Sequence, residues 1–268
     1  MKYISLVLSF FYCSLSLAQL NRIDHFIVVS PHAEQLYHLL RNDFQLPVLW
    51  PYQTFRGFAS GGVSLGNVTL ELVARENLSR AHFASMALEP RESAEKMVRV
   101  LDSLDIPHGT VSPYVTTLDN GGKDTLWKTV TLNEHFFICD YNNRSAHQLR
   151  NKRAGDSLQQ KRGGPLGIIK LKEIVGGGDD LPAISSEIIK LPGIKGEKEN
   201  LFTFSTGPSI RLVNSEQPGI QKIILLVKSI AAAKSYLQSK GMLGMATGDS
   251  LFIDPKAVDG LEIELREK

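Results

Sequence analysis

Two side chains, His25 and Glu71, stand out as groups that could do chemistry, because each interrupts an apolar stretch. His25 precedes the apolar run 26–29, and Glu71 lies in the middle of the run 68–73. Imidazole and carboxylate groups transfer protons and bind divalent metals. Each also has a plainer interpretation, His25 as a polar residue at a strand entrance and Glu71 on the solvent face of a strand. Strand alternation puts Glu71 on the same face of the strand as Val73. Alternation alone does not show whether that face lies in the protein interior or in solvent.

Later in the chain, the pattern around these two residues recurs. His82 begins a stretch that repeats the pattern around His25, so His82 is a candidate pocket residue. The counterpart of Glu71 falls at Cys139 or Asp140, and only one of two adjacent strand residues can face a pocket. A cysteine at this place is a possible ligand, although a buried structural thiol is the more common role. Asp140 is a candidate for proton transfer.

The segment 62–66 reads Gly-Val-Ser-Leu-Gly, which matches the G-x-S-x-G pattern of a hydrolase nucleophile elbow. Ser64 would then be the nucleophile. That elbow works as a strand, a turn and a helix, which together expose the serine. Here a predicted strand follows at 68–73, so we expect the match to be a coincidence. A serine hydrolase stays a functional hypothesis beside the two that are given below.

The elements that must position these residues form an internal repeat. An apolar strand at 23–29 leads into a helix from Ser30, an N-cap residue, and three strands follow. We expect those three strands at 55–60, 62–65 and 68–73. The same order of strand, helix and strands recurs from His82, Gly167 and Lys222. Four copies indicate an α+β fold of repeated βαβββ modules.

Three stretches, 23–29, 66–73 and 254–265, carry a resemblance to a known family. The first resembles the opening strand of the vicinal oxygen chelate superfamily, with its metal-binding histidine. The second resembles that family's last strand with its metal-binding carboxylate, and the third resembles the closing strand of a later module. Within the superfamily, the chain resembles glyoxalase-like domain proteins. The resemblance implies four modules paired into two curved half-barrel sheets, as in glyoxalases and extradiol dioxygenases.

The resemblance also implies a metal site in the first pair of modules. His25, His82 and Glu71 would form a two-histidine, one-carboxylate face for Fe, Mn, Ni or Zn. Asp140 would be the reserve fourth ligand, and Glu71 or Asp140 would move a proton. The fourth module has Gln221-Lys222 where a histidine would stand. We therefore expect the second pair to be structural or a dimer surface, which leaves a homodimer open.

The leading functional hypothesis is a metal-dependent lyase, isomerase or dioxygenase acting on a small chelating substrate. The metal would polarise an oxygen of that substrate. The alternative is a metal-free protein of the same fold that binds or sequesters a small molecule. The formal charge of +2 argues against nucleic acid as a partner.

The chain divides into four parts at the level of sequence. These are a signal peptide at 1–18, a first module pair at 19–145, a basic linker at 146–166 and a second, degenerate pair at 167–268. The nearly uncharged stretch before Gln19 ends in Ser-Leu-Ala, which predicts an exported protein, periplasmic or secreted, that is not held in the membrane after cleavage. We expect the linker to be a solvated connector because it is rich in Lys and Arg.

Overall fold

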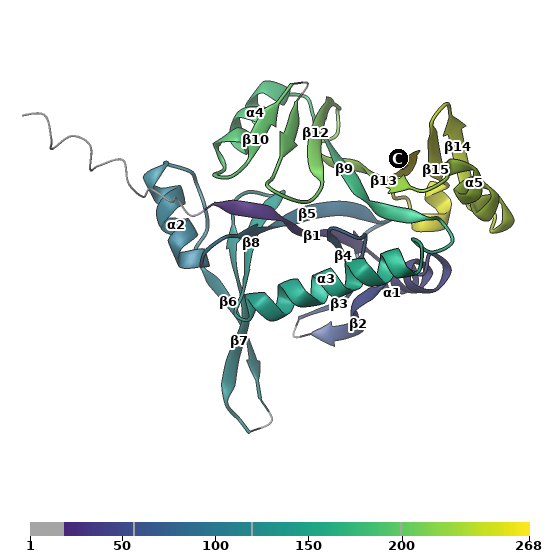
Figure 1. Ribbon diagram of the computed structural model, residues 1–268. Helices are drawn as coiled ribbons and strands as arrows, with labels where there is room; N and C mark the ends of the chain where they lie inside the picture. Colours follow the sequence, from purple (N-terminus) through teal and green to yellow (C-terminus); the bar gives the residue numbers. More distant parts are fainter. Residues whose placement is uncertain (1–18, 56, 119, 199) are drawn as a thin grey trace, which may run out of the picture.

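The structure is a computed structural model that describes residues 19–55, 57–118, 120–198 and 200–268. These residues form four βαβββ modules and two eight-stranded mixed sheets, with two modules in each sheet. Figure 1 shows the two sheets packed against each other, with the long helix α3 running along the first sheet. The predicted fold class is therefore confirmed. The expected signal peptide lies outside the described residues.

The first module differs from its prediction at Ser30, which ends a strand and does not cap the helix, and at 55–60 and 62–65, which fall largely in one strand. Its elements are β1 (Leu20–Ser30), α1 (Ala33–His38), the π-helical turn η1 (Leu39–Asp43), β2 (Val48–Phe55), β3 (Phe58–Ser64) and β4 (Thr69–Ala74). The chain turns at Gly57, whose φ of +90° suits glycine, and not at Gly61 as expected. Gly61 and Gly62 lie inside β3 because the rings of Tyr37 and Trp50 occupy the space that a Cβ would need.

The second module has a long hairpin between its helix and its last strand. Its elements are β5 (His82–Pro90), α2 (Ala94–Ser103), β6 (Ser112–Thr117), β7 (Lys123–Thr131) and β8 (Phe136–Tyr141). The backbone N–H of Lys96 donates to the Ser93 side chain, so Ser93 caps α2. The β6–β7 hairpin projects from the body of the molecule in Figure 1.

The segment expected to be a solvated connector is a helix, α3 (Arg144–Gln160). The side chain of Asn143 caps it by accepting from the Ala146 N–H at 3.1 Å. Its buried residues include His147 and Leu158, so one face packs against the protein. Sequence pattern did not predict this helix because that face is partly polar, while the apolar periodicity that marks most packed helices is absent.

The third and fourth modules repeat the order of the first two, and their second and third strands are shorter. The third comprises β9 (Ile168–Gly178), α4 (Leu181–Lys190), β10 (Lys195–Glu197), β11 (Leu201–Thr203) and β12 (Ser209–Asn214). The fourth comprises β13 (Gly219–Val227), α5 (Ile230–Ser239), β14 (Leu243–Thr247), β15 (Ser250–Ile253), the 3-10 turn η2 (Pro255–Val258) and β16 (Ile263–Glu267). Asp180 and Ser229 cap the two helices.

Both sheets have the same strand order, which fixes where their centres lie. The first strands of two modules pair antiparallel in the middle of each sheet, β1 with β5 and β9 with β13. The last strand of each module lies parallel to its own first strand. One apolar core runs through both sheets, and the Asn67 side chain makes two 3.0 Å hydrogen bonds with the Leu171 backbone across the junction. Within the described ranges, no helix is both long and apolar enough to span a bilayer.

Candidate functional site

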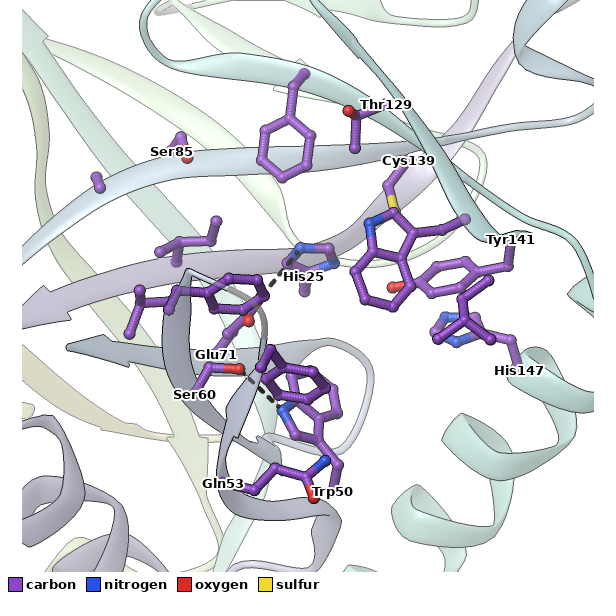
Figure 2. Close-up of a pocket in the computed structure, with 18 of the residues that line it drawn as sticks. His25, Trp50, Gln53, Ser60, Glu71, Ser85, Thr129, Cys139, Tyr141 and His147 are labelled. Carbon is purple, nitrogen blue, oxygen red and sulfur yellow. Dashed lines mark hydrogen bonds and ion pairs between the residues drawn. The ribbon is translucent and has the colours of Figure 1, made fainter. Parts of the chain in front are cut away.

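A cavity of about 790 Å³ lies against the first sheet. His25 and Glu71 face each other inside it, and α3 contributes His147 and Arg150 to one side (Figure 2). Six aromatic residues contribute to the remaining wall, beside smaller apolar and polar side chains. The aromatic residues that line the cavity are Trp50, Phe55, Phe58, Trp127, Phe137 and Tyr141. Such walls present flat apolar faces to a ligand.

A chain of ring contacts joins the two hairpins that border the cavity. Phe55 stacks on Phe58 with ring centroids 5.1 Å apart, at the tip of the β2–β3 hairpin. Phe58 meets Tyr114 of β6 edge-on at 6.4 Å. Tyr114 in turn stacks on Trp127 of β7 at 4.2 Å. The two hairpins at the edges of the curled sheet are therefore held together by aromatic contacts.

His25 is a buried imidazole held between two carboxylates. Its Nδ1 lies 2.8 Å from Asp24 Oδ2, and its Nε2 lies 3.4 Å from Glu71 Oε2. Burial alone would lower the pKa of His25. The hydrogen bond to Asp24 and the charges of Asp24 and Glu71 outweigh burial and raise that pKa above its ordinary value. The arrangement can hold a proton on His25 facing the cavity.

Asp24 is the central residue of a polar network that holds His25. Its second oxygen, Oδ1, lies 2.7 Å from His147 Nε2, and the Tyr141 hydroxyl donates to Oδ2 at 3.1 Å. Burial would raise the pKa of the Asp24 carboxyl, but the hydrogen bonds from His147 and His25 hold it well below its usual range. Asp24 therefore stays ionised and fixes the orientation of both imidazole rings.

His147 reaches this network from α3, and no role was predicted for it. A guanidinium only donates, so Arg150 donates to His147 Nδ1 at 2.9 Å and the remaining proton of the ring faces Asp24. Tyr141 stacks on the His147 ring with centroids 3.6 Å apart. Because α3 itself was not predicted from the sequence, nothing pointed to a histidine from this segment entering the site.

Two of the predicted site residues lie away from the cavity. His82 is exposed at the start of β5 and does not line the cavity, so it does not join His25 and Glu71. Asp140 faces the other side of β8, where it accepts from the Ala94 N–H at 2.9 Å and from Arg144 at 2.6 Å. Of the adjacent pair at this point, Cys139 faces the cavity, and burial with the nearby Asp24 charge raises its thiol pKa well above its ordinary value.

Strand register identifies the true counterparts of His25 and Glu71 in the second module. His25 pairs with Ala87, and Ile27 pairs with Ser85. A two-fold axis midway between these two pairs relates the modules, and it exchanges His25 with Ser85. Glu71 lies beside Ile27, and Phe137 lies in the same relation beside Ala87. The second module therefore offers a hydroxyl and a phenyl ring where the first offers imidazole and carboxylate. His82 lies three positions from Ser85, because β5 runs on to Pro90 before its helix begins.

The same two positions in the second sheet carry complete ion pairs. Glu173 and Lys222 are the counterparts of His25, and Arg211 and Glu264 are the counterparts of Glu71. Arg211 donates twice to Glu173, at 3.0 and 3.1 Å. Lys222 donates to Glu264 at 2.6 Å. Burial would raise the pKa of Glu264, but hydrogen bonds from Arg266, Lys222 and Ser250 lower it to about 2.

The donors around the cavity do not fit a resident metal. A divalent ion in this fold position would need a third and a fourth ligand beside His25 and Glu71. Ser85 and Phe137 occupy the matching positions, and Phe137 meets the His25 ring edge-on at 5.6 Å. Among the described residues, no group of three His, Cys, Asp or Glu side chains is placed to hold a metal ion.

Comparisons with known proteins give the fold without a family. No protein-family model matches the chain, and no curated protein sequence matches it significantly. A hypothetical protein from Staphylococcus aureus has a TM-score of 0.62 and 11% identity, over 92% of this chain and 99% of that chain. An extradiol ring-cleaving dioxygenase from B. fuscum has a TM-score of 0.62 and 13% identity, over 94% and 73% of the two chains. A 2,3-dioxygenase from Pseudomonas sp. KL28 has a TM-score of 0.56 and 11% identity, over 94% of each chain. The chain thus has the fold of the extradiol dioxygenases.

Proposed function

We propose that this protein binds a small, planar aromatic molecule in the cavity of its first sheet, without a resident metal. The observation that carries the proposal is a cavity of about 790 Å³ with six aromatic residues in its wall. Ligand sites in proteins are typically clefts of about 300–1,000 Å³ with mostly apolar walls and a few placed polar groups. His25 and Glu71 are the placed polar groups of this cavity.

The fold neighbours support the choice of an aromatic ligand. A homoprotocatechuate 2,3-dioxygenase from Brevibacterium fuscum, 12% identical to this chain, forms a complex with 3,4-dihydroxyphenylacetate. The metal-dependent lyase, isomerase or dioxygenase reaction expected from the sequence is less well supported for this chain. Its second module supplies Ser85 and Phe137 where two more ligands would be needed.

A second candidate function is proton transfer to or from the bound molecule, favoured by the contact between Asp24 and His25. Asp24 accepts a hydrogen bond from His25 Nδ1 at 2.8 Å, which leaves Nε2 directed toward Glu71 and the cavity. A histidine oriented in this way by a buried carboxylate can act as a general acid or base. Glu71 keeps its predicted proton-transfer role in this candidate, whereas Asp140 faces away from the cavity.

Ligand-observed NMR with a library of planar aromatic fragments tests the proposed function. Fragments should bind the wild type and lose binding in Ser85→Phe, which places a ring in the cavity. Val213→Phe adds the same ring to β12 in the second sheet and should leave binding unchanged. Binding that survives Ser85→Phe would place the ligand elsewhere and overturn the proposal.

Native mass spectrometry of the dialysed protein tests whether the protein retains a metal ion. We expect less than about 0.1 equivalent of Fe, Mn, Ni or Zn after each ion has been supplied, because two side-chain donors rarely retain a divalent ion. Stoichiometric metal would restore the metal-dependent hypothesis. The same spectrum reports whether the protein is a monomer or the homodimer left open by the sequence.

Export is a separate proposal that depends on residues 1–18. N-terminal sequencing of the protein recovered outside the cytoplasm should begin at or near Gln19. Finding Met1 on the soluble protein would contradict export.

A further inference from the structure

The carboxylate of Glu71 has fewer hydrogen-bond donors than Glu173 and Glu264, the two carboxylates at the centre of the second sheet. In the part of the chain that the structure describes, its one charged neighbour is His25 Nε2, at 3.4 Å. That distance is longer than a good N–H···O hydrogen bond. Glu264, in the matching position, has Lys222, Arg266 and Ser250 as donors at 2.5–2.7 Å.

Burial makes this shortage costly. The Glu71 side chain is 13% exposed, against 2% for Glu264 and 6% for Glu173. A carboxylate withdrawn from water needs donors to replace those it has lost. Chain residues supply them for Glu173 and Glu264. For Glu71, which lines the cavity, water or a ligand that enters the cavity can supply the further donors.

The aromatic residues of the cavity wall favour a donor with a positive charge. The faces of Trp, Tyr and Phe attract cations, most strongly when the site is desolvated. The cavity already contains one such contact, because the Arg150 guanidinium lies 5.7 Å from the centre of the Trp50 ring. A second cation bound between the aromatic rings and Glu71 would be attracted by the rings and by the carboxylate.

Other positive groups near the cavity do not cancel this attraction. Arg75 and Arg150 line the cavity as exposed residues, where water and salt screen their charges. His25 shares its charge between Asp24 and Glu71. Arg22 is engaged by Glu89 at 2.5 Å.

We propose that the ligand is an aromatic amine whose ammonium group donates to Glu71 while its ring system lies between the aromatic walls. This inference rests on the proposed function and names the ligand class of the same site. Amines that carry a planar aromatic body fit both requirements. Aromatic carboxylates of the same shape would place a second negative charge against Glu71.

Calorimetry with three naphthalene compounds of matched shape tests the inference. 2-Naphthylmethylamine should bind the wild type about tenfold more tightly than 2-naphthylmethanol, the scale of a charged hydrogen bond, and 2-naphthoate should bind most weakly. Glu71→Gln should remove the preference for the amine and leave the affinity for the alcohol within about twofold. Glu76→Gln, the same change at an exposed carboxylate nearby, should alter none of the three affinities.

The outcomes separate this inference from the proposed function. If the alcohol binds and the amine is not preferred, or the preference survives Glu71→Gln, the amine inference is wrong and the aromatic site stands. If none of the three compounds binds, both are wrong. Should Glu71→Gln fail to fold, the ranking of the three compounds on the wild type decides the question.

Discussion

The two sheets share one strand order and differ in what stands at their centres. In the second sheet the matched positions hold two complete pairs, Glu173 with Arg211 and Lys222 with Glu264. In the first sheet one module holds His25 and Glu71, while the other holds Ser85 and Phe137. In the second sheet, the charged side chains at the centre are paired with each other. The first leaves one carboxylate short of donors beside a cavity.

This difference shows how one fold can provide both a scaffold and a binding site. A buried ion pair costs desolvation energy for both groups, and that cost is offset when the geometry is good and further hydrogen bonds are made. Glu264 meets this condition through three donors. Glu71 does not, so a ligand that binds only the folded form, as proposed above, would stabilise the first sheet.

The largest expected effect comes from giving the first sheet the two donors that its second module lacks. The double variant Ser85→His/Phe137→Glu should bind Zn(II) on the order of 1,000-fold more tightly than the wild type, because it completes a four-ligand set with His25 and Glu71. Competition with a chromophoric chelator measures this affinity.

Two further variants serve as controls for the built metal site. Adding His82→Ala to the double variant should leave zinc affinity unchanged, since His82 lies outside the cavity. Adding His25→Ala should remove most of it. A folded double variant with wild-type zinc affinity would show that positions matched by strand register do not converge in space.

The second prediction breaks an ion pair of the second sheet. Lys222→Met should destabilise the protein by about 2 kcal/mol, the scale of a hydrogen bond to a charged group, because Lys222 is 26% exposed and Arg266 and Ser250 still hold Glu264. Adding Glu264→Leu should recover most of the loss, since apolar replacement of a whole buried pair is often neutral. Urea denaturation gives both values. A double variant no more stable than Lys222→Met would mean that Glu264 makes a contribution independent of Lys222.

The module order could be predicted from the sequence because it depends on local patterns. Apolar runs and repeated strand–helix spacing are read directly along the chain, and all four modules are present. The pairing of residues across modules could not be read in the same way. A shift of one position reverses the face of every side chain in a strand, and aligning His82 with His25 placed the counterpart three positions too early.

The Asp24 network could not be predicted because it depends on an irregularity. Adjacent residues of a regular strand face opposite ways, so a bond between Asp24 and His25 is not expected from alternation. The pairing of β1 with β5 shifts register between Ile23 and His25, and such a bulge re-aims side chains. His147 then reaches Asp24 from a helix whose sequence lacks an apolar stripe.

The third prediction concerns α3, which supplies wall residues to the first sheet's cavity. His147→Leu should destabilise the protein by about 2 kcal/mol, the scale of a hydrogen bond to a charged group, because it removes the 2.7 Å contact with Asp24. Leu149→Ala, at an exposed position of the same helix, should change stability by less than about 0.5 kcal/mol. Equal effects in urea denaturation would mean that α3 contributes through helix formation alone.

The smallest effect is a difference in pH dependence between the two sheets. The pKa of His25 is raised above its ordinary value of 6.5, so its contribution is complete below that value and is lost as the pH rises through the raised pKa. The pKa of Glu264 is lowered to about 2 from 4.5, so its contribution is complete above 4.5 and is lost as the pH falls toward 2. The melting temperature should therefore fall at both ends of the pH range, for reasons that lie in different sheets.

Two variants separate these contributions. In His25→Gln, the decrease in melting temperature between pH 6.5 and 9 should be smaller than in the wild type by about 2–4 °C, the shift that about 1 kcal/mol produces in a chain of this size. The acid limb of its profile should keep the wild-type slope below pH 4.5. Glu264→Gln should do the reverse, with a flatter acid limb and an unchanged alkaline limb. If either variant flattened both limbs equally, the two charge clusters would be coupled through the shared core, and the sheets could not be treated as independent electrostatic units.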